Sequence, residues 1–210
     1  GSEHSFPTRR SSDLVLIIGF GHHSKRIHFP IIESLADACV VGLVDLDINS
    51  EGIKLFLKQK GRDVCCLFLK SKDDLNSEEL NKFAKKLGVT SVVISTDPDS
   101  HCKYAKWALE RGYSVLLDKP IHAEKNAAHD IDAAMAIHRE YKTLLKVYEK
   151  SKIRFPYLAC EVLSQRRHHP AYQLVKSTIE EIYKKTKSTI TYYYSFHNDG
   201  QRRLPQELTE

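Results

Sequence analysis

The chain has 210 residues, of which 41% are hydrophobic and 28% charged, an ordinary balance for a globular protein with a buried core. Its formal net charge of +5 comes from 32 basic and 27 acidic residues that are interleaved along helical stretches, which argues against a nucleic-acid-binding stripe. No apolar run approaches the roughly 20 residues of a membrane-spanning helix. The five cysteines show no CxxC pairing, so we expect reduced thiols in a cytoplasmic protein.

Residues 1–13 precede the first apolar stretch and have no periodic pattern. They contain no apolar core of a secretory signal, so we expect a non-native or disordered leader.

From Leu14 the chain alternates strand-like and helix-like stretches. Continuous β-rich runs predict strands at 14–20, 39–47, 64–69, 90–96 and 113–118. Helical patterns fill the intervals: a stretch ending near residue 35, and helices at 51–61, 77–88 and 99–112. Pro30 must kink the first of these helices or restart it. Strands without polar alternation are buried on both faces, so the order predicts a doubly wound α/β fold with a parallel Rossmann sheet.

After Pro120 the rhythm changes. The patterns predict a long helix at 124–150, a sixth strand at 157–167, a helix at 171–188 and a strand at 189–197. We therefore expect a nucleotide-binding domain over 14–158 and the start of a second domain over 159–210.

A glycine loop follows the first predicted strand in "IIGFGHHS". Gly19 permits a tight turn, and Gly21 lets the backbone approach a pyrophosphate at a helix N-terminus. Ser24 occupies the third glycine position of the GxGxxG pattern and is still small. A bare GxG is a weak signal, but the strand before it and the helix after it are the context that dinucleotide binding requires.

An acid at the end of the second predicted strand completes this pattern. Asp45 can accept hydrogen bonds from ribose hydroxyls and would repel a 2′-phosphate, so the sequence favours NAD over NADP. Asp47 is a less well placed candidate. Lys25 and Arg26 lie close enough to the loop to keep NADP as an alternative.

The fifth predicted strand ends abruptly in Asp118, Lys119 and Pro120. Charged residues are common where a strand meets solvent, so this segment alone indicates no function. In a doubly wound fold, however, the carboxyl ends of the strands border the ligand crevice.

Four segments together resemble the glucose–fructose oxidoreductase/inositol dehydrogenase (Gfo/Idh/MocA) family: "GFGHHSKRIHFP", "GLVDLD", "ISTDPDSHCKYAKWALERGYSVLLDKP" and "RRHHPAY". The resemblance implies an NAD(P)-dependent oxidoreductase that transfers hydride between nicotinamide and a hydroxyl carbon of a sugar, cyclitol or related polyol. It also implies a second, α+β domain with an open antiparallel sheet, and a homo-oligomer. Because such proteins run well beyond 300 residues, we expect this chain to be truncated within that second domain.

The resemblance assigns roles to single residues. Lys119 matches the catalytic lysine, in a triplet where Asp118 replaces the usual Glu and where Pro120 often follows a cis bond. The loop residues Thr96, Asp97, Pro98 and His101 match positions that border the nicotinamide or the substrate.

Other residues carry weaker expectations. Arg167 and Pro170 match an R-x-x-P region near the substrate, which makes Arg167 and His168 substrate candidates, but a turn at the domain junction explains this segment better. His168 and His169 lack a third ligand of suitable spacing, so we expect no metal. No residue matches the family's later Asp and His. A non-catalytic dinucleotide-binding module or truncated pseudoenzyme is thus the alternative, and an interaction protein that pairs through 189–197 is a third.

Overall fold

The computed structural model describes residues 13–71, 78–164 and 170–188. The chain divides into two compact units, Gly1–Leu163 and Ser164–Glu210. Each unit is described by itself.

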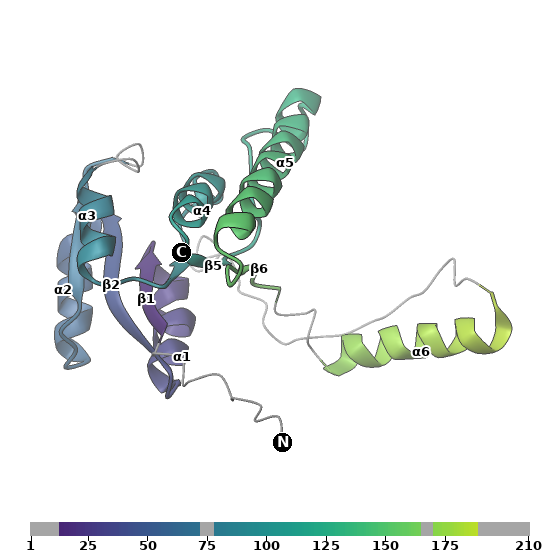
Figure 1. The fold of residues 1–210 in the computed structure, drawn as a ribbon, viewed down its shortest axis with the longest axis horizontal. Helices are drawn as coiled ribbons and strands as arrows, with labels where there is room; N and C mark the ends of the chain where they lie inside the picture. Colours follow the sequence, from purple (N-terminus) through teal and green to yellow (C-terminus); the bar gives the residue numbers. More distant parts are fainter. Residues whose placement is uncertain (1–12, 72–77, 165–169, 189–210) are drawn as a thin grey trace, which may run out of the picture. The chain divides into compact units, whose positions relative to one another are not determined.

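The first unit is built on a six-stranded sheet in the order β3-β2-β1-β4-β5-β6 (Figure 1). The strands are β1 (Asp13–Ile18), β2 (Ala38–Leu46), β3 (Cys65–Leu69), β4 (Ser91–Ile94), β5 (Ser114–Leu117) and β6 (Cys160–Val162). Every neighbouring pair is parallel. This strand order is that of the doubly wound dinucleotide-binding fold, which confirms the predicted fold class.

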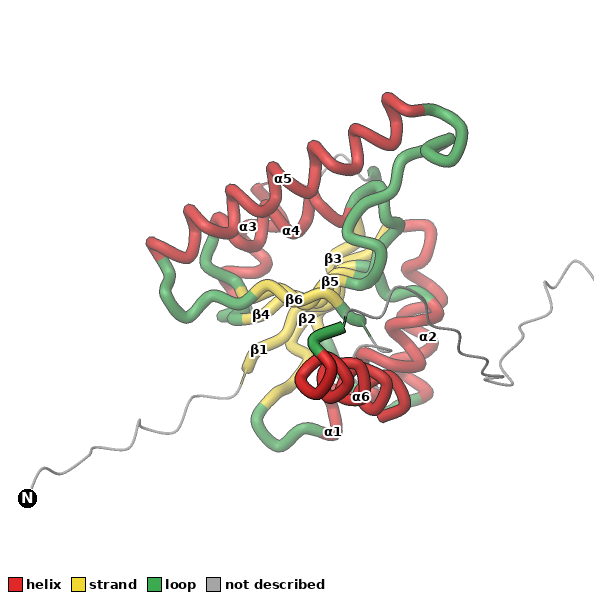
Figure 2. Tube along the Cα trace, turned by 90° about the vertical axis from the view of Figure 1, so that its right-hand side faces the viewer, coloured by secondary structure: helices red, strands yellow, loops and turns green. Residues whose placement is uncertain are grey.

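Helices cover both faces of this sheet (Figure 2). On one face lie α3 (Glu78–Lys86), α4 (His101–Glu110) and α5 (Ile131–Arg154); on the other lie α1 (Phe29–Ser34) and α2 (Ser50–Gln59). In β1, Leu16 and Ile18 pack into the first layer, and Val15 and Ile17 pack into the second. Both faces of the strand are therefore buried, as its unbroken apolar sequence predicts.

The helix after the glycine loop is divided in two. A π-helical segment, η1 (Ser24–His28), passes directly into α1, and Pro30 lies in the first turn of α1. Proline is tolerated there because the first N–H groups of a helix have no partner within the helix. The backbone angles stay helical through His28 and Phe29, so in place of the expected kink or restart the helix changes from π-helical to α-helical geometry.

The long helix starts later than predicted, at Ile131 rather than 124, and it ends at Arg154. The Asp130 side chain caps it by accepting hydrogen bonds from the N–H groups of Asp132 and Ala133 at 2.8 and 3.4 Å. A capping carboxylate satisfies the first free donors of a helix and so defines its start.

The sixth strand also differs from its prediction. Only Cys160–Val162 form β6, and they pair with β5 inside the parallel sheet. The first compact unit ends at Leu163, and the domain boundary at 158/159 stays a prediction.

The second unit contains α6 (Pro170–Thr186), close to the helix predicted at 171–188. The predicted strand at 189–197, on which the expected oligomer depends, lies outside the described residues.

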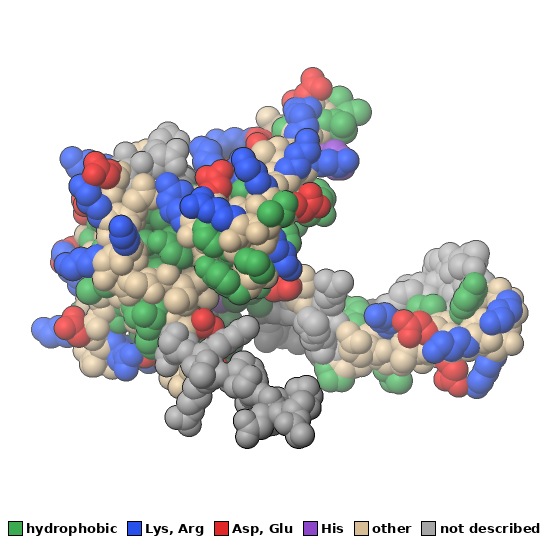
Figure 3. Space-filling model, in the orientation of Figure 1, with side chains coloured by type: hydrophobic (Ala, Val, Ile, Leu, Met, Phe, Trp, Pro, Cys, Tyr) green, Lys and Arg blue, Asp and Glu red, His purple; other side chains and the backbone are tan. Residues whose placement is uncertain are grey.

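On the face seen in Figure 3, basic and acidic side chains are interspersed over the helices. Among the described helices, none is both long and apolar enough to span a membrane. All five cysteines are free thiols; Cys102 is buried and Cys65 is exposed.

Candidate functional site

The glycine loop follows β1 and turns tightly against the residues after β4. Gly19 has φ +87°, and a Cβ built on it would lie 2.5 Å from the carbonyl oxygen of Ser95. Its carbonyl accepts a hydrogen bond of 2.6 Å from the Oγ of Ser24, which is fully buried. Only glycine fits this backbone, and Ser24 fastens the start of η1 to the turn.

Asp45, at the end of β2, faces this loop. Its Oδ2 accepts a hydrogen bond from the N–H of Phe20 at 2.5 Å. Its Oδ1 accepts two of 2.7 Å, from the N–H of Leu46 and from Nδ2 of Asn49. The carboxylate therefore joins the loop after β1 to the end of β2.

A pocket of about 200 Å³ opens at the carboxyl ends of β1, β2 and β4. Five predicted residues line it: Gly19, Gly21, Asp45, Thr96 and Asp97. Seven others line it as well: Ile18, Val44, Leu46, Asn49, Ser95, Ser100 and Tyr104. The crevice thus lies where open α/β sheets bind their ligands.

Hydrogen bonds between its own residues stabilise the loop after β4, which forms one wall of the pocket. Thr96 Oγ1 and Ser100 Oγ are 2.7 Å apart, and Ser100 Oγ donates to the carbonyl of Asp97 at 2.8 Å. The position of Ser100 directly before α4 was a sequence signal for a role at the helix start. Pro98 is half-buried and does not line the pocket.

His101 does not line the pocket either. Its side chain is buried, with Nδ1 2.7 Å from the carbonyl oxygen of Pro120 and Nε2 2.9 Å from that of Thr96. Both ring nitrogens contact backbone oxygens, so His101 links the loop after β4 to the segment after β5. Contact of His101 with cofactor or substrate stays a prediction.

Asp118, Lys119 and Pro120 follow β5, outside the lining of the 200 Å³ pocket. The Lys119–Pro120 bond is cis, and both residues are exposed. Asp118 Oδ1 accepts a hydrogen bond of 2.8 Å from the N–H of Lys119, and Oδ2 accepts one of 3.2 Å from Ser95 Oγ. The shorter acid therefore folds back on the main chain of the lysine that it precedes.

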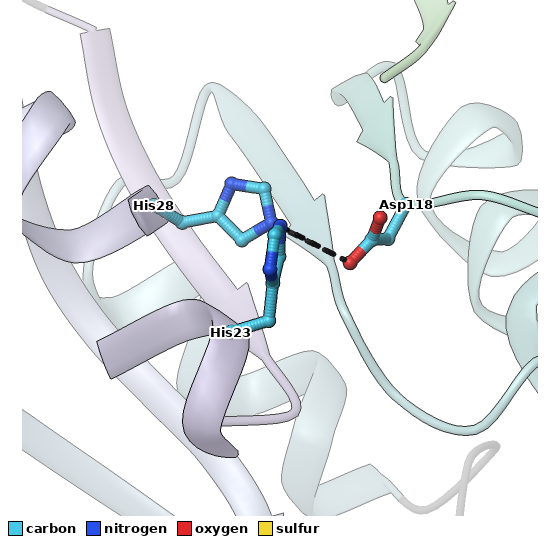
Figure 4. A group of neighbouring side chains, drawn as sticks. All are labelled: His23, His28 and Asp118. Atoms are coloured by element: carbon cyan, nitrogen blue, oxygen red, sulfur yellow. Dashed lines mark ion pairs between the residues drawn. The ribbon is translucent and has the colours of Figure 1, made fainter. Parts of the chain in front are cut away.

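Two histidines from η1 and the residue before it meet Asp118 (Figure 4). The Nε2 atoms of His23 and His28 lie 3.7 and 3.8 Å from Asp118 Oδ2. Burial lowers the pKa of His28, nearby His23 lowers it further, and Asp118 opposes the shift. No sequence pattern brings the two histidines together with Asp118, because they lie far apart in the sequence. The predicted substrate residues Arg167 and His168 lie outside the described residues.

The sheet order, the glycine turn after β1 and the carboxylate at the end of β2 define a Rossmann-type nucleotide-binding domain. A family model described as "Oxidoreductase family, NAD-binding Rossmann fold" matches residues 14–149. The chain therefore belongs to the Gfo/Idh/MocA oxidoreductase family.

Solved structures show the same fold. A Gfo/Idh/MocA family oxidoreductase from Vibrio cholerae is 21% identical, with a TM-score of 0.56 over 81% of this chain and 44% of its own. Scyllo-inositol dehydrogenase from Lactobacillus casei, solved with NAD(H) and scyllo-inositol, is 17% identical, with a TM-score of 0.56 over 81% and 42%. KijD10, a 3-ketoreductase from Actinomadura kijaniata solved with NADP, is 17% identical, with a TM-score of 0.54 over 81% and 44%.

The chain thus spans 42–44% of the length of these three relatives. No curated protein matches it.

Proposed function

We propose that this chain is the dinucleotide-binding part of an oxidoreductase that transfers hydride between a nicotinamide cofactor and a hydroxyl-bearing carbon of a sugar, cyclitol or related polyol. The observation that carries the proposal is the pocket that brings together Gly19, Gly21 and Asp45 at the carboxyl ends of the strands. Membership of an oxidoreductase family supports the reaction class.

Gly21 is the residue that we expect to meet the pyrophosphate. A Cβ on Gly21 would have no protein atom within 4 Å, so the space beside it is open to a ligand. A backbone without a side chain can approach phosphate oxygens closely and offer them its N–H groups.

We propose NAD as the preferred cofactor. Asp45 lines the pocket and carries a carboxylate, which can accept ribose hydroxyls and repels a 2′-phosphate. The cations that would favour NADP, Lys25 and Arg26, line a separate hollow beside Phe29 and Phe56.

Lys119 is the proposed catalytic residue. It stands exposed at the carboxyl end of β5, where it could hydrogen-bond the reacting hydroxyl and assist proton transfer. The nicotinamide would supply the hydride chemistry, and Thr96 and Asp97 would border it. Scyllo-inositol, which the Lactobacillus casei enzyme binds, represents the proposed substrate class.

Fluorescence titration with NADH, repeated with NADPH, tests the cofactor site. We expect saturable NADH binding that is much tighter than NADPH binding. Gly21→Ala should abolish NADH binding, because the added methyl group occupies the space of the pyrophosphate. No binding of either nucleotide by folded chain would refute the proposal.

Turnover is tested separately in a full-length version of the protein, because we expect this chain alone to be inactive; NADH formation from NAD is followed with scyllo-inositol and other polyols. Lys119→Ala should abolish turnover and leave NADH binding unchanged. If the full-length version binds NADH but oxidises none of the polyols, the protein acts as a dinucleotide-binding module.

A further inference from the structure

Three side chains converge between the glycine loop and the end of β5 (Figure 4). They are His23 and His28, one before η1 and one at its end, and Asp118, directly after β5. One nitrogen of each ring and one carboxylate oxygen all lie within 4.8 Å of one another. The imidazole rings stand edge to face, with centroids 5.0 Å apart and an interplanar angle of 78°.

The two ring nitrogens of this group are unsatisfied within the described part of the chain. The Nε2 atoms of His23 and His28 are buried and have no hydrogen-bond partner. Their distances to Asp118 Oδ2, 3.7 and 3.8 Å, are too long for hydrogen bonds. Only 4% of the His28 side chain is exposed, so solvent does not compensate it. A buried donor or acceptor without a partner is unusual, and an ion or a water between the groups would satisfy it.

The chemistry of the three groups indicates which occupant fits. Two imidazole nitrogens and one carboxylate oxygen are a ligand set of zinc and other first-row transition metals, whereas magnesium and calcium prefer oxygen alone. Tetrahedral zinc at its usual bond lengths separates two ligand atoms by about 3.4 Å. The two nitrogen–oxygen distances, 3.7 and 3.8 Å, need a closure of only a few tenths of an ångström, and the two ring nitrogens lie within 4.8 Å of each other.

The carboxylate is also oriented by outer contacts, as metal ligands commonly are. Asp118 Oδ1 is held by the N–H of Lys119 at 2.8 Å, and Oδ2 accepts a hydrogen bond from Ser95 Oγ at 3.2 Å. These contacts turn Oδ2 toward the two rings, as Figure 4 shows.

We propose that His23, His28 and Asp118 form a binding site for one divalent transition-metal ion of the zinc class. The ion ties η1, which follows the glycine loop, to the segment that carries Lys119. Three protein ligands leave a further coordination position for water or another small ligand. The site rests on its own geometry and does not depend on dinucleotide binding.

Calorimetric titration of Zn²⁺ into EDTA-treated, re-purified full chain tests the site. We expect one Zn²⁺ to bind at the triad, and Mg²⁺ to give no comparable heat. His23→Ala should weaken Zn²⁺ binding by more than the about 10–100-fold that loss of an outer-shell partner costs. His22→Ala is the matched control, because the His22 ring is exposed beside Arg26 and lies outside the triad.

His23 is the primary variant because 36% of its side chain is exposed, so its removal should leave the fold intact. Asp118→Asn is the second variant, since it keeps the shape of the side chain and removes the charge. Circular dichroism checks both. Co²⁺ in place of Zn²⁺ should give visible absorption bands that His23→Ala removes and His22→Ala keeps. The paired histidines at 168 and 169 are present in both variants, so any difference between them reports on the triad.

Three results would overturn the proposal. Zn²⁺ could fail to bind to folded chain, or His23→Ala and His22→Ala could bind it equally well. His23→Ala could also weaken NADH binding in the fluorescence titration while Zn²⁺ binding stays unchanged, which would assign the triad to the dinucleotide. NADH binding and Zn²⁺ binding are measured separately, so failure of one proposal is distinguishable from failure of the other.

Discussion

Gly19 and Gly21 lie in one loop, but we expect their replacement by alanine to change the free energy of unfolding by different amounts. Gly19→Ala places a methyl group 2.5 Å from a backbone oxygen of Ser95, at φ +87°. We expect it to lower the free energy of unfolding by more than about 2 kcal/mol, because neither the backbone nor the neighbouring strand can yield cheaply. Gly21→Ala meets no protein atom within 4 Å, so its stability should match that of the unaltered chain.

Urea denaturation of the two glycine variants measures this difference. A Gly19→Ala protein as stable as the Gly21→Ala protein would show that the turn is not held as the structure has it.

Asp45 is expected to matter for stability as well as for the cofactor. Its carboxylate accepts hydrogen bonds from Phe20, Leu46 and Asn49. Asp45→Asn keeps the size of the side chain but replaces one carboxylate oxygen with an NH₂ group. This group is a donor, and it faces an N–H donor that the oxygen accepted from. We expect the free energy of unfolding to fall by about 1–3 kcal/mol, since hydrogen bonds to a charged group are lost.

The same Asp45→Asn variant should also narrow the preference for NADH over NADPH in the fluorescence titration, because the repelling charge is gone. An unchanged ratio of NADH affinity to NADPH affinity would show that Asp45 does not determine the choice of cofactor. Asp47→Asn is the control, since Asp47 does not line the pocket.

Sequence reasoning reached some site residues and missed others for a definite reason. Asp45 and the glycine loop were predictable because neighbouring parallel strands bring their carboxyl ends to one edge. Asn49 and Tyr104 were not, since their approach depends on how η2 (Asp47–Asn49) and α4 pack. His28 was not predictable because the π-helical geometry of η1 aims its ring toward β5.

At the scale of elements, apolar strands were predictable and boundaries were less so. The five long apolar runs all became strands, because each is buried between two helical layers. The sixth strand was predicted at 157–167, but only the three residues of β6 form it, and their pairing with β5 is a property of the folded sheet. The start of α5 depends on one capping side chain, Asp130, that residues of good helix propensity on both sides conceal.

The reactivity of two thiols tests how tightly α4 and β6 pack in the core on one face of the sheet. Burial raises the pKa of Cys102, on α4, to about 11, and burial likewise raises the pKa of Cys160, on β6, to about 11. Such a thiol holds about a hundredth of the ordinary thiolate at neutral pH, and the thiolate is the reactive form. In native protein, iodoacetamide should therefore label Cys102 and Cys160 at least about tenfold more slowly than the exposed Cys65.

Mass spectrometry of peptides from a labelling time course measures these rates. In urea all three cysteines should react alike, which controls for local sequence. Native labelling of Cys102 as fast as Cys65 would mean that this layer opens readily.

At the scale of the whole molecule, the limits of the first unit can be tested by where the chain is cut. A chain that ends at Leu163 keeps β6, whose neighbours are fixed by hydrogen bonds from Val115 N–H to the Ala159 carbonyl (2.9 Å) and from Leu163 N–H to the Leu117 carbonyl (2.8 Å). A chain that ends at Leu158 loses both bonds and the whole of the β5–β6 pairing.

We expect the chain that ends at Leu163 to unfold in one transition, at a Tm close to that of the first unit in the full chain, because the described helix of the second unit has no buried residue. The chain that ends at Leu158 should melt at least about 5 °C lower. It exposes the edge of β5 and loses core contacts, and in a domain of this size such a loss of stability lowers the Tm by several degrees. Differential scanning calorimetry compares the three chains. Equal Tm values for both shortened chains would place β6 outside the cooperative unit and return the boundary to the position expected from the sequence.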